Sequence, residues 1–157
     1  KKTLIILCCG LVLVGGFYVL QTPRVPERKI VLPTETGIVY KKKEIVLGSS
    51  TFVLEIADTP ALKERGLSYR TQLTPHTGML FVFDTPAPHY FWMKDMNFPI
   101  DIIWLDRSKK VVHIEKNLSP KTYPKSFGPA SKTQYVIELQ AGIAENIGLK
   151  VGDNVKF

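Results

Sequence analysis

The chain has 157 residues, of which 45% are hydrophobic, and a formal net charge of +7 at pH 7. This length corresponds to one domain with a shorter appendage. The charge is uneven, because residues 1–44 carry eight Lys and Arg against three Glu, whereas residues 45–157 carry thirteen against eleven acidic residues. A nearly balanced domain without a basic block lacks the electrostatic footprint of nucleic-acid binding, so we expect no nucleic-acid partner.

Cysteine is confined to one place in the sequence. Cys8 and Cys9 both lie in an apolar run near the N-terminus, and no cysteine follows them. The rest of the chain therefore has no disulfide, no thiolate nucleophile and no cysteine-based zinc site. We expect its domain to be held together by a hydrophobic core alone.

The N-terminal segment is the strongest localisation signal. Seventeen residues without a charge, Leu4–Leu20, follow Lys1 and Lys2 almost at once. As a helix they would span about 25 Å, close to the hydrocarbon thickness of a bilayer. Residues 1–22 are interpreted as a retained transmembrane anchor or as a signal peptide cut near Gly16, and we favour the anchor because the apolar character continues to Leu20. Both interpretations predict a periplasmic or extracellular domain, which is secreted if the segment is cleaved.

Residues 23–44 are predicted to form an extended, basic tether. They contain Pro23, Pro26 and Pro33 and the run Lys41–Lys43, a composition typical of linkers. The lysine run either touches anionic lipid headgroups or is simply solvated. The globular domain is predicted to occupy residues 45–157.

The first elements expected in that domain are a hairpin and a short helix. Ile45–Leu47 and Thr51–Ile56 are apolar runs on either side of a Gly-Ser-Ser turn, which favours a β-hairpin. Asp58 or Thr59 is a suitable N-cap and Pro60 a suitable first helical residue, so a helix is expected there, ending near Gly66.

The remaining pattern is mostly that of short strands. Strands are predicted at Met79–Phe83, Tyr90–Lys94, Ile100–Leu105, Lys110–Glu115, Gln134–Leu139 and Val155–Phe157, with loops at Asp84–His89 and Asn117–Pro129 and a helix at Ala141–Gly148. This pattern predicts an α+β, predominantly β fold: a compact barrel- or sandwich-like domain of short strands with two short helices.

Several blocks of this sequence match a known family. In order, they are Arg65–Arg70, Gly78–Phe83, Phe91–Met96, Ile100–Ile102, Glu138–Gly142 and Gly148–Asp153. In sequence and spacing they resemble domain-of-unknown-function family 192, a small bacterial and archaeal domain, over about Gly48 to Phe157. The resemblance implies a compact β-rich domain, often with an N-terminal signal or anchor, and implies no function. The chain has Ser68 where the family usually has Met, and Asp95 where it usually has Asn.

The candidate site residues are polar groups embedded in apolar strands or next to them. They are Arg65, Arg70, Trp92, Lys94, Asp95, Asp101 and Glu138. A carboxylate in an apolar strand needs a partner. In a structural interpretation, Asp101 or Glu138 pairs with Lys94, Arg65 or Arg70, or faces water. In a binding interpretation, Trp92 stacks on a sugar ring or another flat group, while the cations hold a carboxylate or phosphate.

We therefore predict a membrane-tethered extracytoplasmic binding or accessory module. Its partner would be an envelope component such as a glycan, a small polar ligand or another protein, besides the membrane that holds Leu4–Leu20. The alternative is a small cell-envelope hydrolase that uses Asp101 and Glu138 as acid and base. The histidines lack metal-ligand spacing and no glycine-rich phosphate loop is visible, so neither a metal nor a cofactor is predicted.

Overall fold

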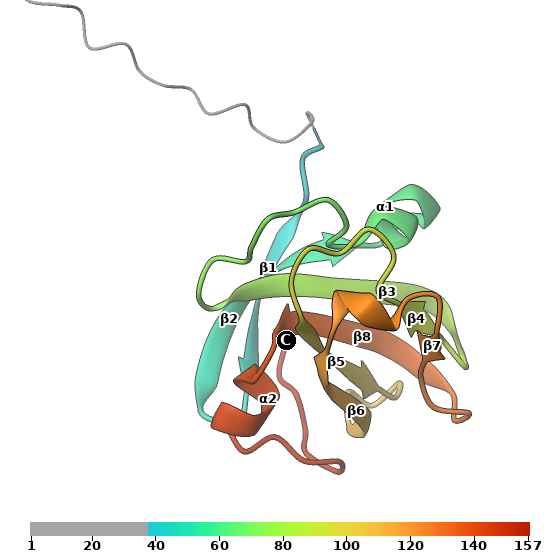
Figure 1. Cartoon of the computed structure of the whole chain (residues 1–157). Coiled ribbons are helices and arrows are strands. Elements are labelled where there is room, and N and C mark those ends of the chain that lie inside the picture. Colours follow the sequence, from blue (N-terminus) through green and yellow to red (C-terminus); the bar gives the residue numbers. More distant parts are fainter. Residues whose placement is uncertain (1–37) are drawn as a thin grey trace, which may run out of the picture. The chain divides into compact units, whose positions relative to one another are not determined.

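The computed structural model describes residues 38–157 (Figure 1). The predicted anchor Leu4–Leu20 and nearly all of the predicted tether lie outside the described residues. Within residues 38–157, no helix is long and apolar enough to cross a membrane. The first strand begins at Lys42, slightly before the predicted start of the domain.

A six-stranded mixed sheet forms the framework of the domain (Figure 1). Its order is β1-β2-β3-β8-β5-β6, and β2 and β3 are parallel, whereas every other neighbouring pair is antiparallel. The strands are β1 (Lys42–Leu47), β2 (Ser50–Ala57), β3 (Thr77–Ala87), β5 (Ile100–Leu105), β6 (Val111–Leu118) and β8 (Thr133–Gln140).

Smaller elements cover the sheet. Residues 38–157 contain two α-helices, α1 (Pro60–Arg65) and α2 (Ile143–Asn146), and a short 3₁₀ helix, η1 (Pro120–Thr122). A separate two-stranded ribbon pairs β4 (Phe91–Trp92) with β7 (Ser126–Phe127). The predominantly β fold with two short α-helices is confirmed, and the large sheet is not closed into a barrel.

The sheet has a hydrophobic core on each face, because side chains alternate along every strand. On the face covered by α2, the core includes Leu80, Ile103 and Ile137. On the face covered by α1 and the β4–β7 ribbon, it includes Phe81, Trp104 and Val136. We call these the α2 face and the α1 face.

Several elements differ from the prediction. β6 extends to Leu118, and the predicted loop Asn117–Pro129 contains η1 and β7. β3 continues to Ala87, through the segment predicted as a proline-broken loop. The pairing of β3 with β2 ends at Phe81, and its register with β8 shifts after Val82. Pro86 lies in this irregular stretch, so its missing N–H removes no hydrogen bond from the ladder.

The prediction of a last strand at Val155–Phe157 is wrong. Residues 154–157 form only single bridges, between Lys156 and Val46 of β1 and between Asn154 and Lys110 beside β6. Because this segment crosses from one edge strand to the other, it pairs with each over a single residue and builds no ladder.

Candidate functional site

A cavity of about 340 Å³ opens on the α1 face, and we call it the aromatic pocket. Its walls are mainly apolar, and polar side chains stand at its floor and mouth. The walls include Leu67, Phe81, Phe83, Phe91, Trp92 and Met96, the polar groups inside include Ser68, His89 and Glu138, and the mouth includes Lys63, Glu64 and Arg65.

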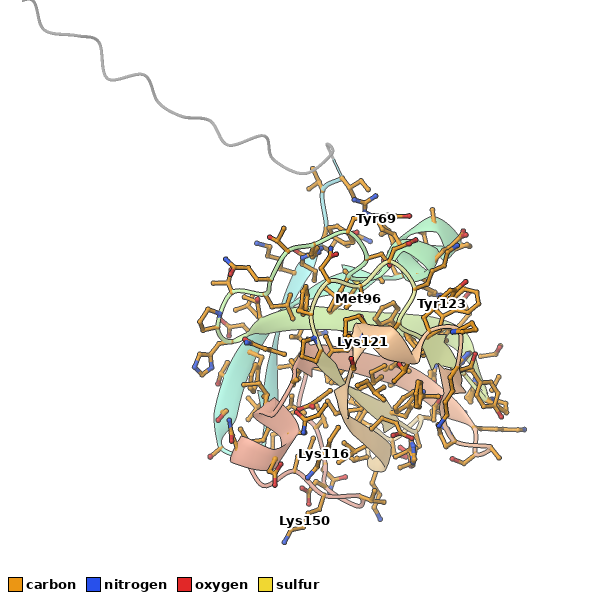
Figure 2. All side chains as sticks on the ribbon, in the orientation of Figure 1. Tyr69, Met96, Lys116, Lys121, Tyr123 and Lys150 are labelled. Carbon is orange, nitrogen blue, oxygen red and sulfur yellow. The ribbon has the colours of Figure 1, made fainter. Side chains whose placement is uncertain are left out.

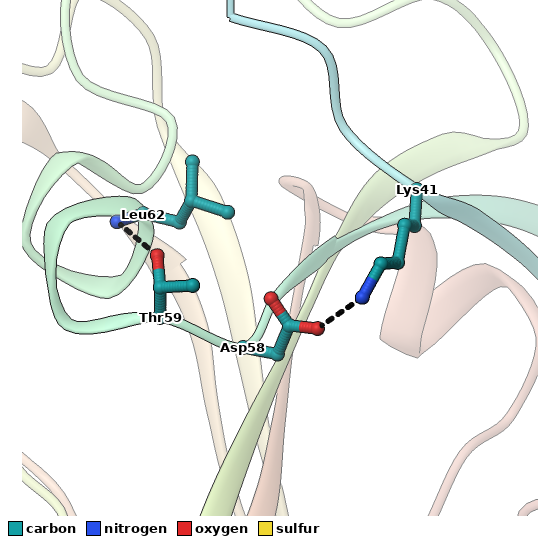
Figure 3. A network of polar contacts seen from close by, with 4 residues as sticks. All are labelled: Lys41, Asp58, Thr59 and Leu62. Carbon is teal, nitrogen blue, oxygen red and sulfur yellow. Dashed lines mark hydrogen bonds and ion pairs between the residues drawn. The ribbon is translucent and has the colours of Figure 1, made fainter.

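Local signals in the sequence position α1 at the mouth of this pocket. The side chain of Thr59 accepts a hydrogen bond from the backbone N–H of Leu62 at 3.3 Å, as an N-cap does, and Pro60 begins the helix (Figure 3). Asp58 instead pairs with Lys41 at 3.0 Å, and this hydrogen bond lowers the pKa of the Asp58 carboxyl.

Gly66 ends the helix at φ 51°, and its N–H donates to the carbonyl of Leu62. A Cβ at Gly66 would lie 3.4 Å from the ring of Phe81 and 3.8 Å from Oε2 of Glu138. The glycine therefore permits the helix end and leaves the space above the pocket floor open.

Glu138 is the most unusual group in the pocket. It lies on β8 between Met79 of β3 and Ile102 of β5, and it is only 5% exposed. Its Oε2 has no hydrogen-bond partner. Burial raises the pKa of the carboxyl to about 8, although the positive charge of Arg70 opposes the shift. At neutral pH, Glu138 is therefore mainly an uncharged carboxylic acid, able to donate a hydrogen bond.

His89 presents a second unpartnered polar atom. Its ring stacks on Phe83, with centroids 3.4 Å apart and planes 14° apart, and its Nε2 is buried without a partner. Burial lowers the pKa of the imidazole, so the ring is neutral at pH 7. The backbone carbonyl of His89 accepts a hydrogen bond of 2.8 Å from Nε1 of the buried Trp104, which ties this loop to the sheet.

A second cavity of about 260 Å³, which we call the rim hollow, adjoins the pocket. It shares Glu64, Arg65, Ser68 and Trp92 with the pocket, and adds Ala61, Tyr69, Lys94 and Asp95. The arrangement thus brings together four predicted site residues, Arg65, Trp92, Lys94 and Asp95, at the mouth, with Glu138 at the floor of the neighbouring pocket.

Hydrogen bonds connect the two loops of the rim hollow. The Tyr69 hydroxyl donates to Oδ2 of Asp95 at 2.7 Å, and the Tyr69 N–H donates to the Asp95 carbonyl at 2.8 Å. The Ser68 hydroxyl donates to the carbonyl of Lys94 at 2.9 Å. Ser68 and Asp95, the two departures from the family pattern, therefore lie on the same junction between these loops.

Two predicted site residues lie elsewhere. Arg70 forms an ion pair with Glu55 and lies over the ring of Tyr40, 5.5 Å from its centroid. Asp101 is fully buried, and its carboxylate accepts hydrogen bonds from the backbone N–H groups of Asn117, Gly142 and Ala144 at 2.8, 3.2 and 2.8 Å.

The suggested pairing of Asp101 with an Arg or Lys is therefore wrong, because backbone donors satisfy this carboxylate instead.

The sequence does not single out His89, Phe81 or Phe83 as site residues, whereas Trp92 was predicted. His89 ends the predicted loop Asp84–His89, and nothing in the local sequence indicates that its ring folds onto Phe83. The spacing of Phe81 and Phe83 does carry a signal, since residues two apart on a strand face the same side.

Comparison with known proteins places the domain in a family. The family model DUF192, described as "Uncharacterized ACR, COG1430", matches residues 43–157. A UPF0127 protein of Thermococcus sibiricus is 29% identical over 111 residues, which cover 66% of this chain and 65% of that protein. A UPF0127 protein of Thermococcus kodakarensis is equally similar, with 64% of its length covered. The matched part thus spans just under two thirds of these relatives.

Two solved structures share the fold. One is a protein of unknown function from Novosphingobium aromaticivorans, with a TM-score of 0.72 and 29% identity over 78% of this chain and 90% of that one. The other, from Sinorhizobium meliloti, is described as a proposed transcription regulator, with a TM-score of 0.71 and 29% identity over 76% of this chain and 95% of that one.

Proposed function

This chain belongs to the DUF192 family, and we propose that its domain is a binding module for a small organic ligand whose ring enters the aromatic pocket. One observation carries the proposal: Glu138 is buried at the pocket floor with an oxygen that has no hydrogen-bond partner. Buried polar atoms are almost always satisfied, so an unpaired one in a cavity calls for a complementary group from outside the chain.

The residues around Glu138 are also suited to a small ring-bearing ligand. His89 also lines the pocket and has a buried, unpaired Nε2, while Phe81, Phe83 and Phe91 provide apolar walls. Mostly apolar walls with a few convergent polar groups are typical of small-molecule sites. The ligand would contribute a flat or saturated ring to the walls and one or two hydrogen-bonding atoms to the floor.

The geometry does not favour the alternative hydrolase. On β5 and β8, Glu138 lies opposite Ile102 and Asp101 lies opposite Leu139. Opposed residues share a face and neighbours alternate, so the two carboxyl groups project from opposite faces of the sheet. They cannot act on one glycosidic bond.

A tethered, extracytoplasmic location is the second part of the proposal. The charge-free run Leu4–Leu20, with two lysines before it, supports it. In a bacterial host, the full chain should stay with the membrane after carbonate washing, and protease added to spheroplasts should digest residues 38–157. Recovery in the cytosolic fraction, or complete protection from the protease, would contradict this location.

The description of the Sinorhizobium protein does not lead us to propose DNA binding here. Residues 45–157 carry thirteen basic against eleven acidic residues, whereas DNA-binding surfaces concentrate positive charge.

A thermal-shift screen tests the binding role. The full chain in detergent is screened against ring-bearing acids, sugars, sugar acids and cell-wall fragments. A ligand at a hundred times its Kd should stabilise the fold by about 2.7 kcal/mol. Trp92→Ala should abolish the shift, because Trp92 lines both cavities and is 51% exposed, whereas Val151→Ala, at an exposed site outside both cavities, should not. A shift that survives Trp92→Ala, or no shift with any class, would count against the pocket.

A further inference from the structure

The rim hollow extends the aromatic pocket outward. The two cavities share Glu64, Arg65, Ser68 and Trp92, so a ligand held in the pocket can continue into the hollow. Figure 2 shows Tyr69, which borders the hollow, and Met96, which lines the pocket, in the upper half of the view near α1, with Lys150 at the opposite end.

Positive groups surround this mouth, and each lies over an aromatic ring. Lys63 Nζ is 4.8 Å from the centroid of Phe83, Arg65 Cζ is 5.6 Å from that of Tyr69, and Lys94 Nζ is 6.0 Å from that of Trp92. Within residues 38–157, neither Lys63 nor Lys94 takes part in an ion pair with a carboxylate. Both ammonium groups therefore keep donors for an incoming anion.

Negative groups at the mouth are fewer and partly engaged. Glu64 borders both cavities and Asp95 borders the hollow. One oxygen of Asp95 already accepts the hydroxyl hydrogen of Tyr69. Three cations thus face two carboxylates, a balance that favours anions over cations at the rim.

The interior of the aromatic pocket, unlike its mouth, favours an uncharged group. Its walls are apolar and its two unpaired polar atoms belong to Glu138 and His89, which are both uncharged at neutral pH. A charged group pushed into it would lose its hydration without a counter-ion. A ligand that satisfies both regions has an uncharged ring at one end and an anionic group at the other.

We propose that the site binds an organic anion, with its ring in the aromatic pocket and its carboxylate or phosphate at the shared mouth, where Lys63 borders the pocket and Lys94 borders the rim hollow. This inference rests on the proposed function, because it assumes that the pocket takes a ring. It adds the sign of the ligand charge and the end of the ligand that carries it.

Matched probes separate the charge from the ring. 4-Hydroxyphenylacetate, 4-methylphenol and tyramine have the same phenol ring with a negative, neutral or positive substituent, and phenyl phosphate replaces the carboxylate with a phosphate. Binding to the full chain in detergent is measured by saturation-transfer NMR and by tryptophan fluorescence, to which Trp92 and the buried Trp104 both contribute. We expect an anion to bind about three- to tenfold more tightly than 4-methylphenol, and tyramine to bind most weakly. The preferred anion tells carboxylate from phosphate.

Lysine variants test the position of the charge. Lys63→Ala and Lys94→Ala should each reduce the affinity for the anionic probe about two- to fivefold and leave that for 4-methylphenol unchanged. Lys150→Ala, an exposed lysine outside both cavities, is the control and should change neither. Added salt should reduce the preference for the anion, because exposed charges are screened.

The outcomes distinguish the two proposals. Equal affinity for the anionic, neutral and positive probes, or tighter binding of tyramine, overturns the inferred anion and leaves the pocket as a ring-binding site. An anion preference that persists in both lysine variants also overturns it. Failure of every probe to bind counts against the ring-binding pocket and therefore against both.

Discussion

Asp101 and Glu138 stand on neighbouring antiparallel strands yet project from opposite faces of the sheet. Asp101 lies opposite Leu139 and Glu138 lies opposite Ile102. The two carboxyl groups also differ in their hydrogen-bond partners. Asp101 receives three backbone N–H groups, whereas Glu138 has an oxygen without a partner. The first carboxylate holds loops together, and the second keeps an unpaired oxygen among the residues that line the aromatic pocket.

The Asp101→Asn variant should destabilise the domain. The asparagine amide keeps one acceptor oxygen but turns N–H donors toward the backbone donors of Asn117, Gly142 or Ala144. We expect the free energy of unfolding to fall by about 2–4 kcal/mol, since hydrogen bonds to a charged group are lost and buried donors become unpaired. Urea unfolding with an unchanged m-value measures this.

Asp106→Asn provides the control for Asp101→Asn. Asp106 also accepts two backbone N–H groups, from Ser108 and Lys110, but in an exposed turn. Asp106→Asn should lower the free energy of unfolding by less than about 1 kcal/mol, because water can replace the lost hydrogen bonds. If Asp101→Asn unfolds at the same urea concentration as the wild type, the role assigned to Asp101 is wrong.

The titration of Glu138 should make stability depend on pH. The folded-state pKa of about 8 lies above the ordinary value of 4.5. Between pH 4.5 and pH 8 the Glu138 carboxyl is ionised in the unfolded chain and protonated in the folded chain. Its contribution to the free energy of unfolding is therefore fully present below pH 4.5 and is lost as the pH rises to 8. The loss could reach about 5 kcal/mol, at about 1.4 kcal/mol for each pKa unit.

Glu138→Gln isolates this contribution. Glutamine does not titrate, so the wild type should lose stability relative to the variant between pH 5 and pH 8, as measured by urea unfolding. Glu145→Gln changes an exposed residue of α2 and should follow the wild-type curve. Parallel curves for the wild type and Glu138→Gln would mean that Glu138 is already ionised in the folded domain.

Much of the framework could be predicted because its signals are local. Thr59 and Pro60 define the start of α1 whatever surrounds them, and the β1–β2 hairpin follows from two apolar runs and one turn. The faces of Asp101 and Glu138 could not be predicted, since they depend on how β5 and β8 align, and a shift of one residue between these strands would put both carboxyl groups on the same face.

The site was predicted in part for the same reason. Trp92, Lys94 and Asp95 are close in sequence, so any fold keeps them near one another, and Arg65 joins them from the end of α1. His89 enters the pocket through contacts with Phe83 and Trp104, which are set by tertiary packing rather than by the neighbouring sequence.

Gly66→Ala should reduce ligand binding as well as stability. The added methyl group would lie 3.4 Å from Phe81 and 3.8 Å from Glu138, inside the pocket lining. Its backbone, at φ 51° and ψ −134°, is one that favours glycine, so we also expect about 1–3 kcal/mol of strain. Binding is measured with the anionic probe under conditions where the variant remains folded.

Gly142→Ala separates strain from obstruction. Gly142 also has a positive φ, 86°, but nothing lies within 4 Å of its added Cβ. The variant should lose about 1 kcal/mol of stability, as for a non-glycine residue in the left-handed region, and should bind the probe like the wild type. Equal binding by the two alanine variants would show that Gly66 does not keep the pocket open.

Asp95→Asn should strengthen the binding of anions. The substitution introduces the residue that the family usually has, and it removes a negative charge from the rim hollow. Asparagine tolerates the φ of 56° found here, and its side-chain oxygen can still accept the Tyr69 hydroxyl hydrogen. The fold should therefore persist while the affinity for the anionic probe rises about two- to fivefold and that for 4-methylphenol stays unchanged.

Two further measurements decide whether Asp95→Asn acts through charge. The hydrogen bond and charge of Asp95 raise the pKa of Tyr69, so the variant should lower that pKa toward its ordinary value in a UV titration. Asp84→Asn removes an exposed charge outside both cavities and should leave anion binding as it is. A local charge effect depends on the position of the carboxylate, so only Asp95→Asn should strengthen anion binding. If both Asp variants strengthened it equally, the net charge of the domain, rather than the charge in the rim hollow, would govern the affinity.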